Sequence, residues 1–252
     1  MVERARPEDI MIVSHENRFI FVHVPKTAGD AIVRAIAPFV GVKDVLVEND
    51  FQGWRRMLIT SGDRQLYQLG KHATASEIKA AMTAARWSTY AKVGFVRHPY
   101  SRAYSVYSYI ARMSRERQHP GIRAVWYWSP IGRRGGDPRL WPAMRAYQQA
   151  QAFSDFIRHP LALEDMAMWP QAKYLADESG RLEVDYVGRF EQLNTDVEAL
   201  LKTLHITGAT LAMRNASKGS TDSPEIALSD RVYLAKVYEC DFELFGYALN
   251  GA

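Results

Sequence analysis

Residues 19–29 carry the sequence FIFVHVPKTAG, and this stretch decides the fold. Its first part, 19–24, is rich in β-branched and aromatic residues and predicts a buried strand. A tight turn over Lys26–Gly29 follows, and in 30–36 apolar residues recur at helical spacing. Asp30 stands where it can cap this helix or lie in its first turn. The stretch therefore predicts a strand, a glycine loop and a helix in succession.

A loop of this kind is suited to an anion. The glycine lets the backbone fold so that successive amide hydrogens converge, and the start of the next helix adds a partial positive charge. It is not a Walker A loop, because Lys26 precedes Gly29 instead of following the glycines. The loop predicts a phosphate-like ligand but matches an ordinary ATP or GTP site poorly. Taken alone, it is equally compatible with a plain turn and a solvated lysine.

A second unit of the same type follows at residues 92–105, KVGFVRHPYSRAYS. Residues 92–96 predict a strand, and Pro99 suits the first turn of a helix that runs through Ser105 to about residue 115. Arg97 stands at the end of the strand, eight positions before Ser105. A guanidinium matches phosphate oxygens bidentately, so this pair could hold a further phosphate.

The rest of the chain continues the alternation of strands and helices. We predict strands at 67–72 and 184–188 and helices at 76–87, 153–158, 193–204 and 229–238. This order predicts an α/β fold with a mostly parallel sheet flanked by helices. We expect a single domain over residues 1–252, with an irregular segment at about 116–145 that forms a long loop or lid.

Composition narrows the function classes. The net charge of +4 is consistent with an anionic ligand and is too weak to indicate nucleic acid. Cys240 is the only cysteine in the sequence, so the chain has neither an intrachain disulfide nor a cysteine-based metal cluster. Charges interrupt residues 1–18, so we expect no signal peptide, no membrane span and a cytoplasmic protein.

Several stretches together resemble the PAPS-dependent sulfotransferases, where PAPS is 3′-phosphoadenosine-5′-phosphosulfate. FIFVHVPKTAG is similar to the family's 5′-phosphosulfate loop, and GFVRHPYSRAYSVYSY to its 3′-phosphate motif. Further similar stretches are 70–75, 184–191, 215–218 and 238–247. The resemblance is to the branch with the chondroitin and heparan sulfate 2-O-sulfotransferases and their soluble bacterial relatives. It implies a P-loop-like sulfotransferase fold and covers nearly the whole chain.

The resemblance also implies the donor site. Lys26, Thr27, Ala28 and Gly29 would wrap the 5′-phosphosulfate of PAPS, Arg97 and Ser105 would bind its 3′-phosphate, and Lys218 would add a phosphate contact. The product would be 3′,5′-adenosine bisphosphate (PAP), and no metal is required.

By its position, Asp30 also counts among the candidate donor-binding residues, but it departs from the family's pattern, which usually has Thr or Ser there. A carboxylate there would repel the anion. We therefore expect Asp30 to turn away and cap its helix; the alternative is that the loop holds the donor through backbone amides and Thr27 alone.

Transfer to a hydroxyl needs a base and a group that stabilises the leaving oxygen. By resemblance, Lys26 would stabilise the oxygen between sulfur and phosphorus, and His72 in GKHATA would be the base. We interpret His23 and His98 as structural histidines, and Glu77 as a residue that starts its helix rather than one that orients His72.

The acceptor side is less specific. Arginines interleave with Trp126, Tyr127, Trp128 and Trp141, which suits a sugar, an anionic glycan or a phenol but equally suits a packed lid with solvated arginines. Sulfuryl transfer from PAPS to a carbohydrate or small-molecule hydroxyl is the function that we predict. A P-loop-type nucleotide kinase and a non-catalytic binder of anionic glycans are the alternatives.

Overall fold

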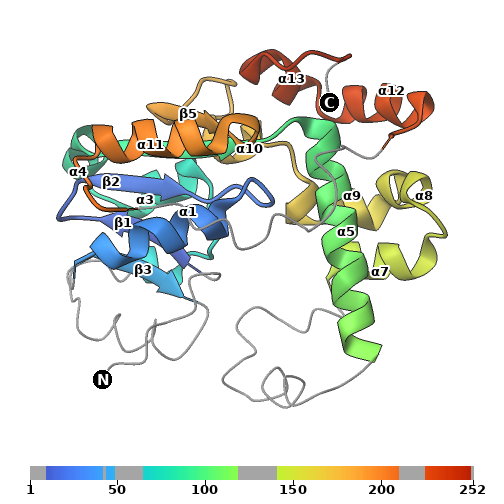
Figure 1. Ribbon diagram of the computed structural model, residues 1–252, viewed down its shortest axis with the longest axis horizontal. Coiled ribbons are helices and arrows are strands. Elements are labelled where there is room, and N and C mark those ends of the chain that lie inside the picture. The colour runs from blue at the N-terminus through green and yellow to red at the C-terminus, as the bar shows by residue number, and fades with distance from the viewer. Residues whose placement is uncertain (1–9, 42–43, 49–64, 119–140, 210–224, 251–252) are drawn as a thin grey trace. The chain divides into compact units, whose positions relative to one another are not determined.

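The computed structural model describes residues 10–41, 44–48, 65–118, 141–209 and 225–250 (Figure 1). The chain divides into two compact units, one of Met1–Val96 with Gln171–Ser220 and one of Arg97–Pro170 with Thr221–Ala252. Compact units occur both inside one domain and as separate domains. The single domain therefore stays a prediction.

A five-stranded sheet forms the centre of the first unit, in the spatial order β3-β1-β2-β4-β5. The strands are β1 (Ile10–Ser14), β2 (Phe19–Val22), β3 (Val45–Glu48), β4 (Ala91–Val96) and β5 (Tyr186–Arg189). β4 is parallel to both β2 and β5, whereas β1 is antiparallel to both of its neighbours. Four of these strands thus share one direction, and the predicted mostly parallel α/β fold is confirmed.

Helices cover both faces of this sheet (Figure 1). On one face, the helices α1 (Gly29–Ile36) and α11 (Leu193–Thr203) pack against Phe21 and Phe95, in one buried cluster. Gly94 points to the other face, because successive strand residues alternate. There Leu175 of α10 (Ala172–Leu175) takes the space that a side chain would need. The helix α3 (Ala75–Ala81) contacts α10, and α4 (Ala84–Thr89) precedes β4.

The strand register fixes where the functional loops begin. Val22 is paired with Gly94 and Val96 with Arg189, in parallel. The carboxyl ends of β2, β4 and β5 therefore lie along one edge of the sheet. The chain leaves β2 at this edge and enters α1 through residues 23–28.

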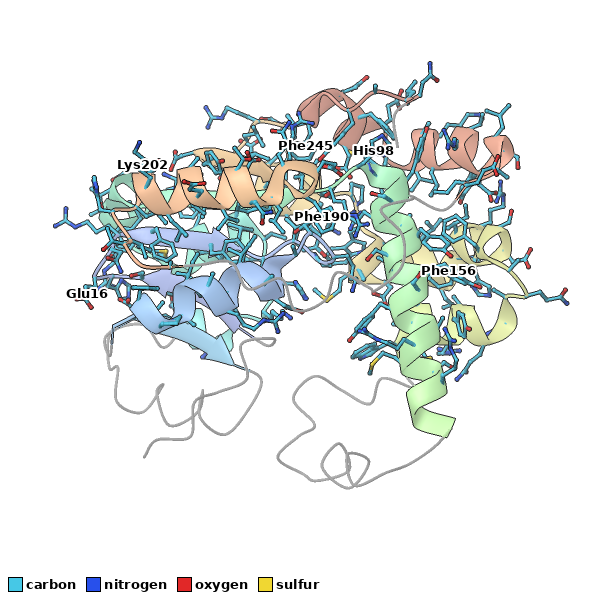
Figure 2. All side chains as sticks on the ribbon, viewed as in Figure 1. Glu16, His98, Phe156, Phe190, Lys202 and Phe245 are labelled. Carbon is cyan, nitrogen blue, oxygen red and sulfur yellow. The ribbon has the colours of Figure 1, made fainter. Side chains whose placement is uncertain are left out.

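The second unit is helical. Its core is formed by α5 (Pro99–Gln118) with α7, α8, α9, α12 and α13. Phe156, labelled in Figure 2, lies with its ring centroid 5.4 Å from that of Tyr107 on α5. The bounds of the other helices are Pro142–Gln149 (α7), Phe153–Arg158 (α8), Pro160–Glu164 (α9), Leu228–Val237 (α12) and Glu239–Phe245 (α13).

Two predicted elements need correction. The strand expected at 67–72 is wrong: a 3-10 helix (Leu66–Gln68) and a turn occupy this region. The helix expected at 76–87 is two helices, because the backbone is extended at Met82 and the side chain of Thr83 then caps α4 by accepting from the amide of Arg86. An N-cap hydroxyl followed by new helical residues starts a new helix.

The acceptor segment predicted at 116–145 is helical at both ends, since α5 continues to Gln118 and α7 begins at Pro142. Residues 119–140, with Trp126, Tyr127 and Trp128, lie outside the described residues. No helix in the described part of the chain is long and apolar enough to cross a membrane.

Candidate functional site

The loop between β2 and α1 has a backbone shaped for an anion. Lys26 and Ala28 have φ angles of 68° and 67°, in the left-handed region that non-glycine residues rarely adopt. The hydroxyl of Thr27, which is buried, donates to the carbonyl of Val24 at 3.0 Å and holds the turn. Helix α1 starts at once, and its N-cap residue, Ala28, has no side-chain acceptor. The amide of Ala31 donates to the carbonyl of Ala28 at 2.9 Å. No side chain caps the helix, so the amides of Gly29 and Asp30 are suited to an external anion.

Gly29 is required for a reason that the sequence did not indicate. Its φ is not in the left-handed region, so the expectation that glycine provides the unusual backbone conformation is wrong. A Cβ added at Gly29 would lie 2.0 Å from Nε2 of His23. The glycine allows a buried imidazole to pack directly against the start of α1.

Asp30 does not cap α1, and that expectation is also wrong. It lies in the first turn of the helix, and its Oδ1 accepts a hydrogen bond from Nζ of Lys71 at 2.8 Å. The same oxygen is 3.6 Å from Nε2 of His23. The carboxylate is bound to a cation 41 positions along the chain instead of to its own helix amides.

His72 lies against the same loop. Its Nδ1 is 2.7 Å from the backbone carbonyl oxygen of His23, and the two imidazole rings meet edge to face with centroids 4.8 Å apart. A carbonyl only accepts, so Nδ1 carries the proton in this hydrogen bond. In the neutral ring Nε2 then holds the lone pair, and His72 is prepared to take a proton at Nε2.

The surroundings keep this imidazole neutral. The pKa of His72 is lowered from 6.5 to about 4, first by burial, then by the charge of Lys71 and, least, by that of Lys26; the carbonyl of His23 and the carboxylate of Asp30 act in the opposite direction. The influence of Lys26 and Lys71 on one ring indicates that the three side chains share a single electrostatic environment.

The titration of His72 gives a first testable prediction. In the free protein, the ring should titrate well below 6.5, near the lowered pKa of about 4. Because folding lowers this pKa, the contribution of His72 to stability is complete above pH 6.5 and is lost as the pH falls toward 4. NMR titration of the ring, assigned by comparison with His72→Asn, checks this. A midpoint at or above 6.5 would contradict it.

Glu77 is part of a capping box at the start of α3. Its amide donates to the hydroxyl of Thr74, and its carboxylate accepts from the amide of Thr74 at 2.7 Å. The interpretation of Glu77 as a helix-starting residue is confirmed. This cap anchors the end of the turn in which Lys71 and His72 lie.

In the second unit, the start of α5 organises Arg97. Nε of Arg97 donates to the hydroxyl of Ser101 at 3.0 Å, and that hydroxyl donates to the carbonyl of His98. Ser105 is four residues after Ser101, on the same face of the helix. Ser101, which holds the side chain of Arg97, and Ser105 therefore lie on one face of α5. Their predicted role at a 3′-phosphate stays a prediction, as does that of Lys218, which lies outside the described residues.

The ring of His98, labelled in Figure 2, is surrounded by aromatic side chains. It lies 5.0–5.6 Å, between centroids, from the rings of Tyr100, Phe242 and Tyr247, and its Nε2 is 3.1 Å from the carbonyl oxygen of Ala248. These contacts agree with the interpretation of His98 as a structural residue of the second unit.

Sequence reasoning assigned no role at the site to Lys71 and treated His23 as structural only. Lys71 directly precedes His72. The sequence feature that could have indicated its role is Asp30, because a carboxylate beside an anion-binding loop needs a positive counter-charge. His23 had no comparable signal, because its contact with Gly29 depends on how α1 packs on β2.

The comparison with known families agrees with this geometry. The sequence pattern of the sulfotransferase family matches residues 9–248, which is most of the chain. No curated protein and no solved structure matches it. The match includes the loop at Lys26, the turn with His72 and the start of α5. The chain therefore belongs to the sulfotransferase family and is an enzyme that transfers sulfuryl groups from PAPS.

Proposed function

We propose that this enzyme transfers the sulfuryl group of PAPS to a hydroxyl of a carbohydrate or small molecule, with His72 as the base and Lys26 as the group that stabilises the leaving oxygen. The observation that carries the proposal is the hydrogen bond from Nδ1 of His72 to the carbonyl of His23, which leaves Nε2 as the basic atom. A second observation supports the proposal: His72 and the loop at Lys26 both belong to the first unit.

The loop suits the 5′-phosphosulfate. Left-handed backbone at Lys26 and Ala28, directly before a helix start, turns amide hydrogens toward a common point. The hydroxyl of Thr27 is engaged with Val24, so Thr27 would offer its backbone amide rather than its hydroxyl hydrogen. Asp30 would not contact the donor, because its carboxylate is paired with Lys71.

The proposed transfer needs only PAPS and the acceptor hydroxyl as reactants. The acceptor oxygen forms a bond to sulfur in line with the bond that breaks, between sulfur and the oxygen bridging to phosphorus. Nε2 of His72 takes the acceptor's proton. The ammonium of Lys26 stabilises the negative charge that collects on the bridging oxygen, and PAP departs with the electron pair.

The acceptor class rests on two weaker supports. One is the resemblance to carbohydrate 2-O-sulfotransferases, and the other is the mixture of arginine and aromatic residues in 112–145, most of which lies outside the described residues. Membership of the sulfotransferase family argues against the kinase and the non-catalytic glycan binder as alternatives.

Nucleotide binding and transfer assays test the function. Calorimetry should show PAP binding in clear preference to ADP, because ADP lacks the 3′-phosphate for which Arg97 and Ser105 are proposed. Transfer of radiolabelled sulfate from PAPS to glycans, phenols and lipid alcohols would then identify the acceptor. Equal affinity for PAP and ADP would contradict the proposed donor site.

Arg97→Ala gives a second prediction. Loss of a charged hydrogen-bonding partner from a phosphate should weaken PAP binding by about 2 kcal/mol, roughly 30-fold in Kd. Binding of 5′-AMP, which has no 3′-phosphate, should stay nearly unchanged. Arg112→Ala, which removes an exposed arginine from α5, the helix that begins two residues after Arg97, is the matched control. Equal losses for PAP and 5′-AMP would mean that Arg97 does not bind the 3′-phosphate.

A further inference from the structure

The ion pair between Asp30 and Lys71 joins the start of α1, directly after the proposed donor-binding loop, to the segment that carries His72. Nζ of Lys71 is 2.8 Å from Oδ1 of Asp30. The side chain of Lys71 is only 13% exposed, whereas that of Asp30 is 46% exposed. The cation is thus held inside the protein, and the acid to which it is bound faces solvent at the start of α1.

The position of Asp30 presents a physical problem. A negative charge in the first turn of a helix is favourable for the helix, because it interacts with the positive end of the macrodipole. The same positive end attracts a phosphate-like anion at the preceding loop. An uncompensated carboxylate would compete with the donor and repel it.

We propose that Lys71 is the counter-ion that makes Asp30 compatible with an anionic donor, so that Lys71 is a positioning residue that supports PAPS binding through Asp30 without contacting PAPS. This inference rests on the proposed donor site at the loop between β2 and α1.

The geometry gives the reason. Two opposite charges 2.8 Å apart present a dipole to a nearby anion instead of a full negative charge, and the field of a dipole falls off faster with distance. The pair therefore replaces, without net charge, the neutral hydroxyl residue that the family usually has at position 30. Low exposure of Lys71 reduces the screening of its charge by water and salt.

The pair also bears on the base. Lys71 is the direct neighbour of His72, and Asp30 is 3.6 Å from His23, whose carbonyl holds Nδ1 of His72. The contact of Lys71 attaches residues 70–74 to the start of α1, and the contact of His72 attaches them to the loop between β2 and α1. Charge compensation at the donor and placement of the base are thus provided by the same short segment.

A double-mutant cycle on PAP binding tests the proposal. Lys71→Met should raise the Kd for PAP about tenfold, because it leaves the carboxylate of Asp30 uncompensated. Asp30→Asn alone should stay within about threefold of the original chain, and the double variant should recover to that same range. Lys71→Arg, which keeps the charge, should bind PAP normally. Lys79→Met is the control, since Lys79 makes an ion pair of similar length with Glu183, 2.6 Å apart.

The double-mutant cycle distinguishes a counter-ion for Asp30 from a lysine that binds PAPS directly. A lysine that bound PAPS directly would leave the double variant as weak as Lys71→Met, and that result would overturn the proposal. So would a Kd within threefold of the original for Lys71→Met. If Lys71→Met does not fold, as judged by circular dichroism, Lys71→Gln replaces it in the cycle. Failure of the unaltered enzyme to bind PAP would instead reject the donor site itself.

Discussion

Replacing His72 by asparagine is expected to lower kcat by about 100- to 10,000-fold, the usual contribution of a general base. The amide nitrogen of asparagine can take the place of Nδ1 and keep the hydrogen bond to the carbonyl of His23, but nothing replaces the lone pair of Nε2. PAP affinity should change less than about threefold, because the proposed base acts on the acceptor. Sulfate transfer at saturating PAPS and calorimetry with PAP measure the two quantities.

The variant His72→Ala should lose the same activity and some stability as well. It removes the hydrogen bond that the carbonyl of His23 accepts from Nδ1 of His72, and loss of such a hydrogen bond costs about 0.5–1.5 kcal/mol. His15→Ala is the control: His15 lies in the hairpin at the opposite end of β2 and bonds to the hydroxyl of Tyr90. A kcat within tenfold of the original for His72→Asn would show that another group is the base.

Replacing Gly29 by alanine is expected to have the second large effect. The new Cβ would lie 2.0 Å from Nε2 of His23, whose side chain is buried. Overpacking of this kind lowers the free energy of unfolding by about 1–3 kcal/mol. Displacement of His23 should also disturb His72, so we expect a lower kcat together with weaker PAP binding.

Gly70→Ala is the matched control. Nothing lies within 4 Å of a Cβ built at Gly70, and its φ is not in the left-handed region. Thermal and urea unfolding should separate the two alanine variants clearly. Equal stability for Gly29→Ala and Gly70→Ala would mean that His23 does not pack against the start of α1 as the structure has it.

Much of the fold could be predicted from local sequence. β2, β4 and β5 were predicted to within a few residues, because each is a short apolar run bounded by turn residues. β1 was not predicted, because its apolar stretch, Ile10–Val13, is short and lies between charged and polar residues. It is a strand because β2 and β3 pair with it on both sides.

The same limit explains the wrong strand at 67–72. Tyr67 is of a residue type that is common in strands, yet the segment Leu66–Gln68 pairs with no strand of the described sheet and forms a 3-10 helix. Strand propensity expresses fit to a sheet surface, so it fails where the chain finds no sheet edge. The prediction of helices depends less on such distant partners, because the hydrogen bonds of a helix lie within the helix itself.

For the site, the sequence by itself predicted the loop at Lys26, the pair of Arg97 and Ser105 and, by family resemblance, His72, because each of these predictions depends on residue types at short spacing. Only the tertiary structure decided what Gly29 and Asp30 do. Gly29 makes room for His23, and Asp30 binds Lys71 instead of capping α1. Both contacts join residues that the fold brings together, and a side chain's partner across 41 positions depends on packing and charge that no local pattern records.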